Sequence, residues 1–135
     1  ATINVDTIDI DDTDLFDDIR RGTFEINSEN SLPLDASLAI AFYDEDTHSI
    51  IDLIVSPHVI PSGKVDSITG KSTAPTVGHE RIVLSESNIK NLQKTEKLIL
   101  QLKVKNAGYD AGQVVVLLAN NRIRLEVVLV ADVEF

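Results

Sequence analysis

Alternation of apolar and polar residues predicts β-strands along most of this chain. The clearest example is LILQLKVKN at 98–106, where every second residue from Leu98 to Val104 is apolar. The segment QVVVLLA at 113–119 is apolar on both faces, which is typical of a strand covered on both sides. Other alternating or continuous apolar segments predict strands at 2–10, 22–27, 38–43, 48–55 and 122–135.

One segment has helical rather than strand spacing. Ser85 or Ser87 can cap it, and Ile89 and Leu92 lie three residues apart on one face, which predicts a short helix near 86–94. Seven to eight short strands, close turn signals and a single short helix predict an all-β fold. The specific prediction is an antiparallel immunoglobulin-like β-sandwich.

Two segments depart from regular alternation. In TINVDTIDI the apolar residues change parity around Asp6-Thr7, which predicts either a β-bulge or a crossing between sheets. Residues 56–78 hold three of the four prolines and three of the six glycines, so we expect an irregular or edge region there.

Composition supports the all-β prediction. Val, Ile and Thr together number 38 of the 135 residues, whereas Ala numbers nine. Branching at Cβ restricts χ1 in helices and suits a pleated sheet. The chain has no cysteine, which excludes disulfides, thiolate zinc sites and a cysteine nucleophile.

The net charge of −10 is unevenly distributed. Residues 1–18 hold seven Asp and no Lys or Arg, whereas 19–135 hold 15 acidic and 12 basic residues. We therefore expect a single domain over 1–135, formed by an acidic first segment and a nearly balanced core. Because no basic stripe is present, nucleic acid is not an expected partner. No apolar run approaches the roughly 18 residues of a membrane-spanning helix.

Catalytic signatures are missing from the sequence. There is no Gly-x-Ser-x-Gly motif, and GKST at 70–73 lacks the first glycine of a phosphate-binding loop. The three histidines, His48, His58 and His79, are spaced ten and 21 residues apart, unlike the close pairs that ligate one metal. We predict a non-enzyme without a cofactor, and these histidines as surface loop residues.

The acidic first segment offers the best candidates for cation binding. Oxygen ligands at alternate positions suit Ca²⁺, so Asp9, Asp11, Asp12 and Asp14 are weak calcium candidates. The segment lacks the glycine and the glutamate that an EF-hand requires at fixed positions. A solvated acidic segment is therefore the favoured interpretation, and no metal site is predicted.

Two tyrosines are candidates for ligand binding. Tyr43 and Tyr109 could form a small platform for a carbohydrate, and packing at a sheet rim is the alternative. Acidic residues and prolines such as Asp9 and Pro57 on the expected edge strands discourage edge-to-edge pairing. We therefore expect a monomer or weak dimer.

The order of these features resembles a domain found in secreted or lipid-anchored envelope proteins of the Bacteroidetes. The resemblance covers about residues 20–135 and rests on structural positions, namely Asn30, Leu32, Pro33 and Leu34, then Ser85, Ile89 and Leu92. The stretch NSLPLDASLAIAFYD also resembles stress-related late-embryogenesis-abundant (LEA) type β-sandwiches.

The envelope resemblance implies an exported protein of the periplasm or outer surface, with this domain at the C-terminal end of a larger surface lipoprotein. The function we expect is a non-enzymatic structural or interaction module with a protein partner. The alternative is a carbohydrate-binding module that uses Tyr43 or Tyr109.

Overall fold

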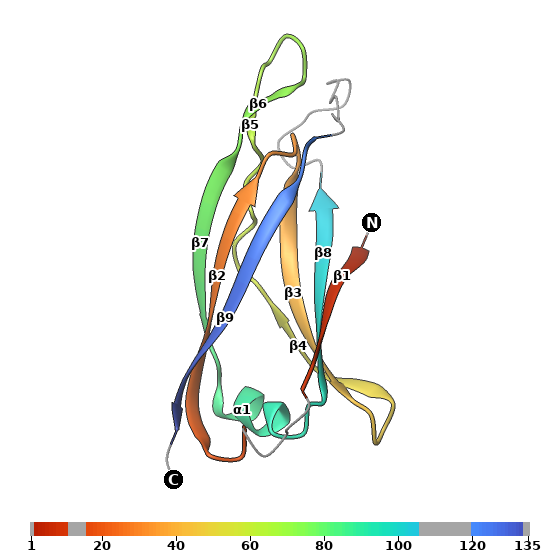
Figure 1. Ribbon diagram of the computed structural model, residues 1–135, viewed down its shortest axis with the longest axis vertical. Helices are drawn as coiled ribbons and strands as arrows, with labels where there is room; N and C mark the ends of the chain where they lie inside the picture. The colour runs from red at the N-terminus through yellow and green to blue at the C-terminus, as the bar shows by residue number, and fades with distance from the viewer. Residues whose placement is uncertain (1, 11–15, 106–119, 134–135) are drawn as a thin grey trace.

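The computed structural model describes residues 2–10, 16–105 and 120–133. These residues form nine strands and one short helix (Figure 1). The elements are β1 (Thr2–Asp9), β2 (Ile19–Asn30), β3 (Asp35–Asp44), β4 (Ser49–Val55), β5 (Lys64–Val65), β6 (Ser72–Ala74), β7 (Thr76–Val83), α1 (Glu86–Leu92), β8 (Lys97–Lys105) and β9 (Ile123–Val133).

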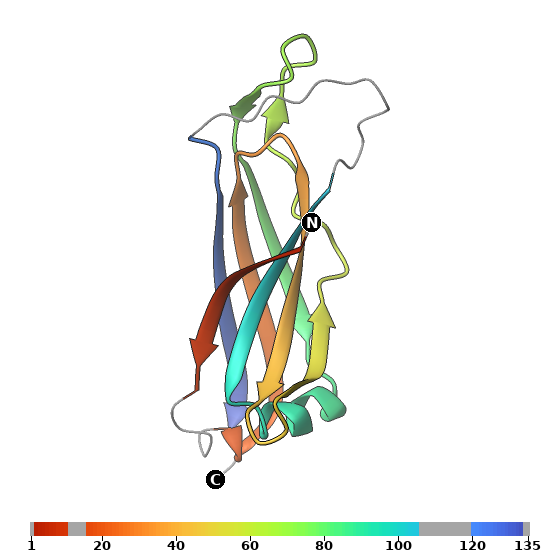
Figure 2. The ribbon, with the colours of Figure 1, turned by 90° about the vertical axis from the view of Figure 1, so that its right-hand side faces the viewer.

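The strands form two main antiparallel sheets that face each other (Figure 2). One sheet has the order β1-β8-β3-β4, and the other has the order β7-β2-β9. Strands β5 and β6 pair only with each other and project from the end of the molecule opposite α1. The predicted antiparallel β-sandwich is thus confirmed.

Alternate residues of the strands build the core between the sheets. Phe24 on β2 meets Phe42 on β3 edge to face, with ring centroids 6.4 Å apart. Both rings are almost fully buried, so this contact joins the centres of the two sheets. Buried aliphatic residues surround the pair, chiefly Ile26, Leu38, Ile40, Ile54, Leu98, Leu100 and Leu102.

Three details refine the sequence predictions. The register of β1 against β8 shifts between Asn4 and Asp6, so the parity change marks a bulge rather than a crossing. The segment expected to be irregular contributes β5, β6 and the first residues of β7. The predicted strand at 113–119 lies outside the described residues.

Asn30, part of the motif behind the envelope resemblance, organises the turn after β2. Its side chain is fully buried, and its Nδ2 donates to the carbonyls of Leu34 and Pro61 at 2.9 and 3.0 Å. Its Oδ1 accepts the N–H of Leu32 at 2.8 Å. The side chain therefore supplies partners to backbone groups that the turn would otherwise leave unsatisfied.

Helix α1 begins where the sequence predicts. Ser85 caps it through its hydroxyl, which accepts the N–H of Asn88 at 3.0 Å, and Asn88 Oδ1 accepts the N–H of Ser85 in return. Asp52 on β4 accepts hydrogen bonds from the amides of Asn88 and Asn91. With Ile89 buried beneath it, the helix is fixed across one end of the sandwich.

Candidate functional site

The pairing of β8 places charged and aromatic residues in one row across the four-stranded sheet. Lys97 lies opposite Asp9 of β1 on one side and opposite Tyr43 of β3 on the other. Residues in register share a sheet face, and this row lies on the face turned away from the core. It borders a hollow of about 450 Å³, which we call the Tyr43 hollow, lined by Thr7, Tyr43, Glu45, His48, Lys97 and Ile99.

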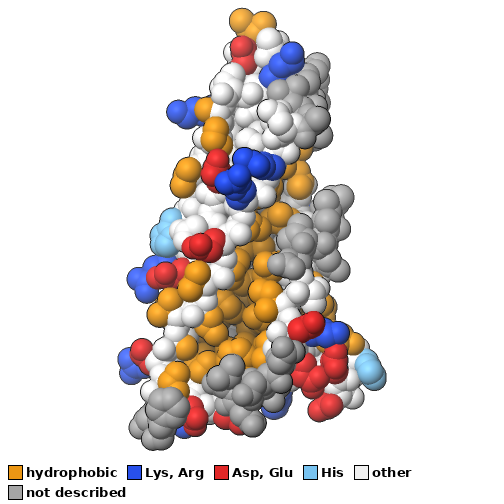
Figure 3. All heavy atoms as spheres, viewed as in Figure 1, with side chains coloured by type: hydrophobic (Ala, Val, Ile, Leu, Met, Phe, Trp, Pro, Cys, Tyr) orange, Lys and Arg blue, Asp and Glu red, His pale blue; other side chains and the backbone are white. Residues whose placement is uncertain are grey.

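Acidic residues from two distant segments meet beside this hollow. The turn between β3 and β4 supplies Asp44, Glu45 and Asp46, and the junction before β8 supplies Glu96. The N–H of Glu96 donates to the carbonyl of Tyr43 at 3.0 Å, which fixes the junction against the turn. Figure 3 shows acidic side chains gathered at this corner of the molecule. We call these four residues the acidic corner.

One ion pair partly neutralises the acidic corner. Lys97 Nζ lies 2.8 Å from Glu45 Oε1. This hydrogen bond, reinforced by the attraction between the charges, lowers the pKa of Glu45 and raises the pKa of Lys97. Loss of solvation, followed by repulsion from Asp46 and Glu45, raises the pKa of Glu96. Two neighbouring carboxyl groups thus have pKa values displaced in opposite directions.

The acidic corner also contains the carboxylates best placed to share a cation. Asp44, Asp46 and Glu96 each offer one oxygen, and these oxygens lie within 4.8 Å of one another. Ca²⁺ requires about six to eight oxygen ligands. One oxygen of the buried Asp44 already accepts the N–H of Asp46 at 2.9 Å. The three residues could therefore hold part of a calcium coordination sphere.

The predicted calcium candidates are only partly described by the structure. Asp9 lies beside Lys97, outside the group of three carboxylates that approach one another. Asp11, Asp12 and Asp14 lie outside the described residues. The first segment thus contributes Asp9 to the neighbourhood of the acidic corner.

His48 borders the hollow from a special backbone conformation. Its φ of 53° places it in the left-handed region, where residues other than glycine are uncommon. The turn that carries Glu45 therefore closes through a conformation that histidine and asparagine tolerate better than branched residues. This closure holds His48 and Glu45 on the same side of the sheet as Tyr43.

A serine, a histidine and a glutamate meet at a second place, where the segment that follows β4 contacts β7. The carboxylate of Glu80 contacts the hydroxyl of the buried Ser56, and its Oε1 lies 3.1 Å from Nδ1 of His58. A hydrolytic triad requires the histidine to lie between the serine and the acid. Here the acid lies between the other two, so the group differs from the order of a hydrolytic triad, and its contacts join β7 to the segment after β4.

The tyrosine predictions have different outcomes. The structure places Tyr43 half-buried at a hollow with charged neighbours, whereas Tyr109 lies outside the described residues. Glu96 and Lys97 were not among the residues predicted from the sequence. Their proximity to Tyr43 depends on strand register, which local alternation does not determine. The acidic turn at 44–46 was the one available signal.

No helix in the described ranges has the length and apolar character needed to cross a membrane. Comparisons of the chain with protein-family models, curated proteins and solved structures give no match. The resemblance to envelope domains therefore stays a prediction.

Proposed function

We propose that this chain is a non-enzymatic interaction module that binds a basic segment of a partner protein at the Tyr43 hollow. The observation that carries the proposal is the concave site itself. It combines an aromatic ring, an apolar residue and charged groups, and lies beside a concentration of carboxylates. A concave surface with a few convergent polar groups is the usual form of a binding site.

The charges around the hollow favour a cationic ligand. Lys97 forms an ion pair with Glu45. In the described part of the chain, Asp44, Asp46 and Glu96 have no basic side chain as a hydrogen-bond or ion-pair partner. A lysine or arginine side chain at Tyr43 would gain a cation–π contact, which contributes about 0.5–1 kcal/mol at exposed sites. Attraction to the carboxylates would add to this contact and would weaken with salt.

The envelope location and the absence of catalysis are parts of the same proposal. The resemblance to Bacteroidetes envelope domains supports a periplasmic or outer-surface location. The arrangement of Ser56, His58 and Glu80 supports a non-enzymatic role, because the serine faces a carboxylate rather than an imidazole.

Carbohydrate binding is the alternative, and the position of Tyr43 favours it specifically. The accessible face of the half-buried Tyr43 ring could stack on a sugar, and Glu45, His48 and Lys97 around it could bond hydroxyl groups. This alternative predicts binding that is insensitive to salt, because a neutral sugar gains little from the carboxylates.

Titration followed by amide NMR tests the proposal. We expect a tetralysine peptide to shift the amides of Tyr43, Glu45 and Lys97 at low salt. Binding should weaken at 0.5 M salt, because the Debye length there is about one third of its value at 0.05 M. Asp46→Asn should weaken the binding about threefold, as expected for loss of one exposed charge contact. Asp132→Asn, an equally exposed change on the other sheet, is the matched control.

Two results would contradict the proposal. One is an equal loss of tetralysine affinity in Asp46→Asn and Asp132→Asn, which would indicate that the peptide responds only to the net charge of the protein. The other is a soluble oligosaccharide, such as maltoheptaose, that shifts the Tyr43 amides at both salt concentrations while tetralysine does not. That outcome would replace the protein partner with the carbohydrate.

A further inference from the structure

A second cavity lies beside α1, on the opposite sheet from the Tyr43 hollow. Its volume is about 670 Å³, within the roughly 300–1,000 Å³ of small-molecule sites. We call it the cationic cavity because three of its lining residues, Arg20, Arg21 and Lys90, are basic in a chain of net charge −10. Apolar side chains also line it, chiefly Ile19, Val83, Leu84 and Ile89.

A β-bulge explains why two arginines lie side by side at this cavity. The register of β2 against β9 shifts between Ile19 and Arg21, so Arg20 is the extra residue. Regular alternation would send consecutive side chains to opposite faces, whereas here both Arg20 and Arg21 are exposed between the buried Ile19 and Gly22. Bulges that redirect a side chain are frequent next to functional sites.

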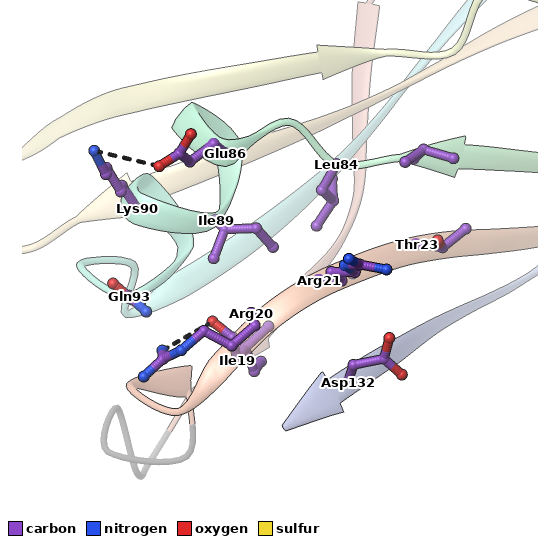
Figure 4. A pocket seen from close by; sticks show the side chains of 12 residues that line it. Ile19, Arg20, Arg21, Thr23, Leu84, Glu86, Ile89, Lys90, Gln93 and Asp132 are labelled. Atoms are coloured by element: carbon purple, nitrogen blue, oxygen red, sulfur yellow. Dashed lines mark hydrogen bonds and ion pairs between the residues drawn. The ribbon is translucent and has the colours of Figure 1, made fainter. Parts of the chain in front are cut away.

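The basic groups differ in their existing partners. Lys90 lies 4.0 Å from Glu86, and Arg20 donates to the backbone carbonyl of Ile19 (Figure 4). Arg20 also donates to the backbone carbonyl of Asp17. The side chain of Arg21 has no hydrogen bond or ion pair within the part of the chain that the structure describes. Asp132 faces it in register on β9 without forming an ion pair. The guanidinium of Arg21 is therefore available to an anion.

The opposite wall is apolar. Figure 4 shows Leu84 and Ile89 reaching from the helical side toward β2, where Arg20 and Arg21 lie. Gly22 keeps this wall close to β2, because a Cβ at that position would lie only 3.1 Å from Leu84 Cδ1. The cavity thus pairs an apolar wall with an unpaired guanidinium.

From this pairing we propose that the cationic cavity binds a small amphipathic monocarboxylate, with its carboxylate on Arg21 and its apolar tail against Leu84 and Ile89. Arginine forms paired hydrogen bonds with a carboxylate, which fixes the orientation of the ligand. The acidic Glu86 and Asp132 at the rim disfavour a dianion such as a phosphate monoester. This inference does not depend on the proposed function of the Tyr43 hollow.

Octanoate is the probe for this site, with 1-octanol as the uncharged control. In an amide NMR titration below the micellar range, octanoate should cause saturable shifts at Arg21, Leu84 and Ile89. Arg21→Gln should weaken this binding about fivefold, as expected for the loss of one partly solvated charge contact. Arg124→Gln, an exposed arginine at the far end of the same sheet, should leave it unchanged.

A second variant tests the same site independently, in case Arg21→Gln impairs folding. Val83 is 76% exposed at the rim, so Val83→Asp should fold normally and repel the carboxylate, again weakening octanoate binding. Equal binding of octanoate and 1-octanol would overturn the proposal, since it would indicate apolar adhesion alone. Unchanged octanoate binding in Arg21→Gln, or an equal loss in Arg124→Gln, would also overturn it.

Discussion

The Tyr43 hollow and the cationic cavity lie at the same end of the sandwich, on opposite sheets, and carry opposite charge. The hollow adjoins four carboxylates and one paired lysine, whereas the cavity has three basic groups and two acidic ones. The net charge of −10 describes neither surface. A molecule that is uniformly acidic by composition can therefore present two sites of different ligand preference.

The two sites also differ in how the backbone assembles them. At the hollow, regular register brings Asp9, Lys97 and Tyr43 from three strands into one row. At the cavity, an irregularity within β2 brings Arg20 and Arg21 together. Regular pairing gathers residues that are distant in sequence, while a bulge gathers neighbours that alternation would separate.

The largest effect should come from the core that both sites share. Phe24→Ala removes the edge-to-face contact with Phe42 and should lower the free energy of unfolding by about 3–5 kcal/mol. Urea denaturation followed at both sites should then show one transition at lower denaturant. Phe24→Leu, which retains more volume, should lose about 1–2 kcal/mol. If one site unfolds well before the other, the two sheets do not form one cooperative unit.

A smaller loss of stability should arise at the end of the molecule opposite both sites. Asn30→Ala leaves the N–H of Leu32 and the carbonyls of Leu34 and Pro61 without their side-chain partner, so we expect a loss of about 2–3 kcal/mol. Asn27→Ala removes two solvent-exposed side-chain hydrogen bonds on the same strand, to Glu126 and His79, and should lower stability by about 1 kcal/mol or less. Denaturation measures both, and equal losses would exclude the special role of Asn30.

The sequence predicted the sandwich because its core strands alternate clearly. β8 and β9 place an apolar residue at every second position, and the cap of α1 is visible as Ser85 before Ile89 and Leu92. β7 was not predicted from the sequence, and the reason is physical. Its half-buried positions include Gly78 and Glu80, so the usual contrast between an apolar and a polar face is missing.

The sites were harder to predict than the strands. Tyr43 was identifiable as a rare aromatic residue, but its neighbours depend on which strands pair and in which register. Arg20 and Arg21 are adjacent in sequence, yet alternation assigns them to opposite faces, and the bulge that reverses this assignment leaves no distinct sequence signal. Tertiary pairing, rather than local pattern, determines both sites.

A change at the N-terminal cap of α1 should affect the cationic cavity and leave the Tyr43 hollow unchanged. Ser85→Ala removes the hydroxyl that accepts the N–H of Asn88, which should cost about 1 kcal/mol of stability. Because α1 carries Ile89 and Lys90 to the cationic cavity, amide shifts should concentrate there and spare the Tyr43 hollow. Ser87→Ala, inside the helix, is the control. Equal shifts at both sites would show that the helix supports them jointly.

The smallest effect concerns pH and is confined to the acidic corner. The pKa of Glu96 is raised, so its contribution to stability is greatest at low pH and is lost as pH rises through its pKa in the folded state. The pKa of Glu45 is lowered, so its contribution is present above the ordinary glutamate value and is lost as pH falls through its folded pKa. Carboxyl ¹³C NMR titration should therefore separate the two residues, with Glu96 titrating above the ordinary value and Glu45 below it.

Lys97→Met tests the cause of this separation. Removing the ammonium group takes away the hydrogen bond and the attraction that lower the pKa of Glu45, so that pKa should rise. Glu96 should remain above its ordinary value, because loss of solvation and repulsion from Asp46 persist. If Glu45 and Glu96 have the same pKa in the unmodified protein, the ion pair with Lys97 does not separate their pKa values. The four carboxylates would then behave as a single negative patch. The acidic corner and the cationic cavity would differ only in the sign of their charge.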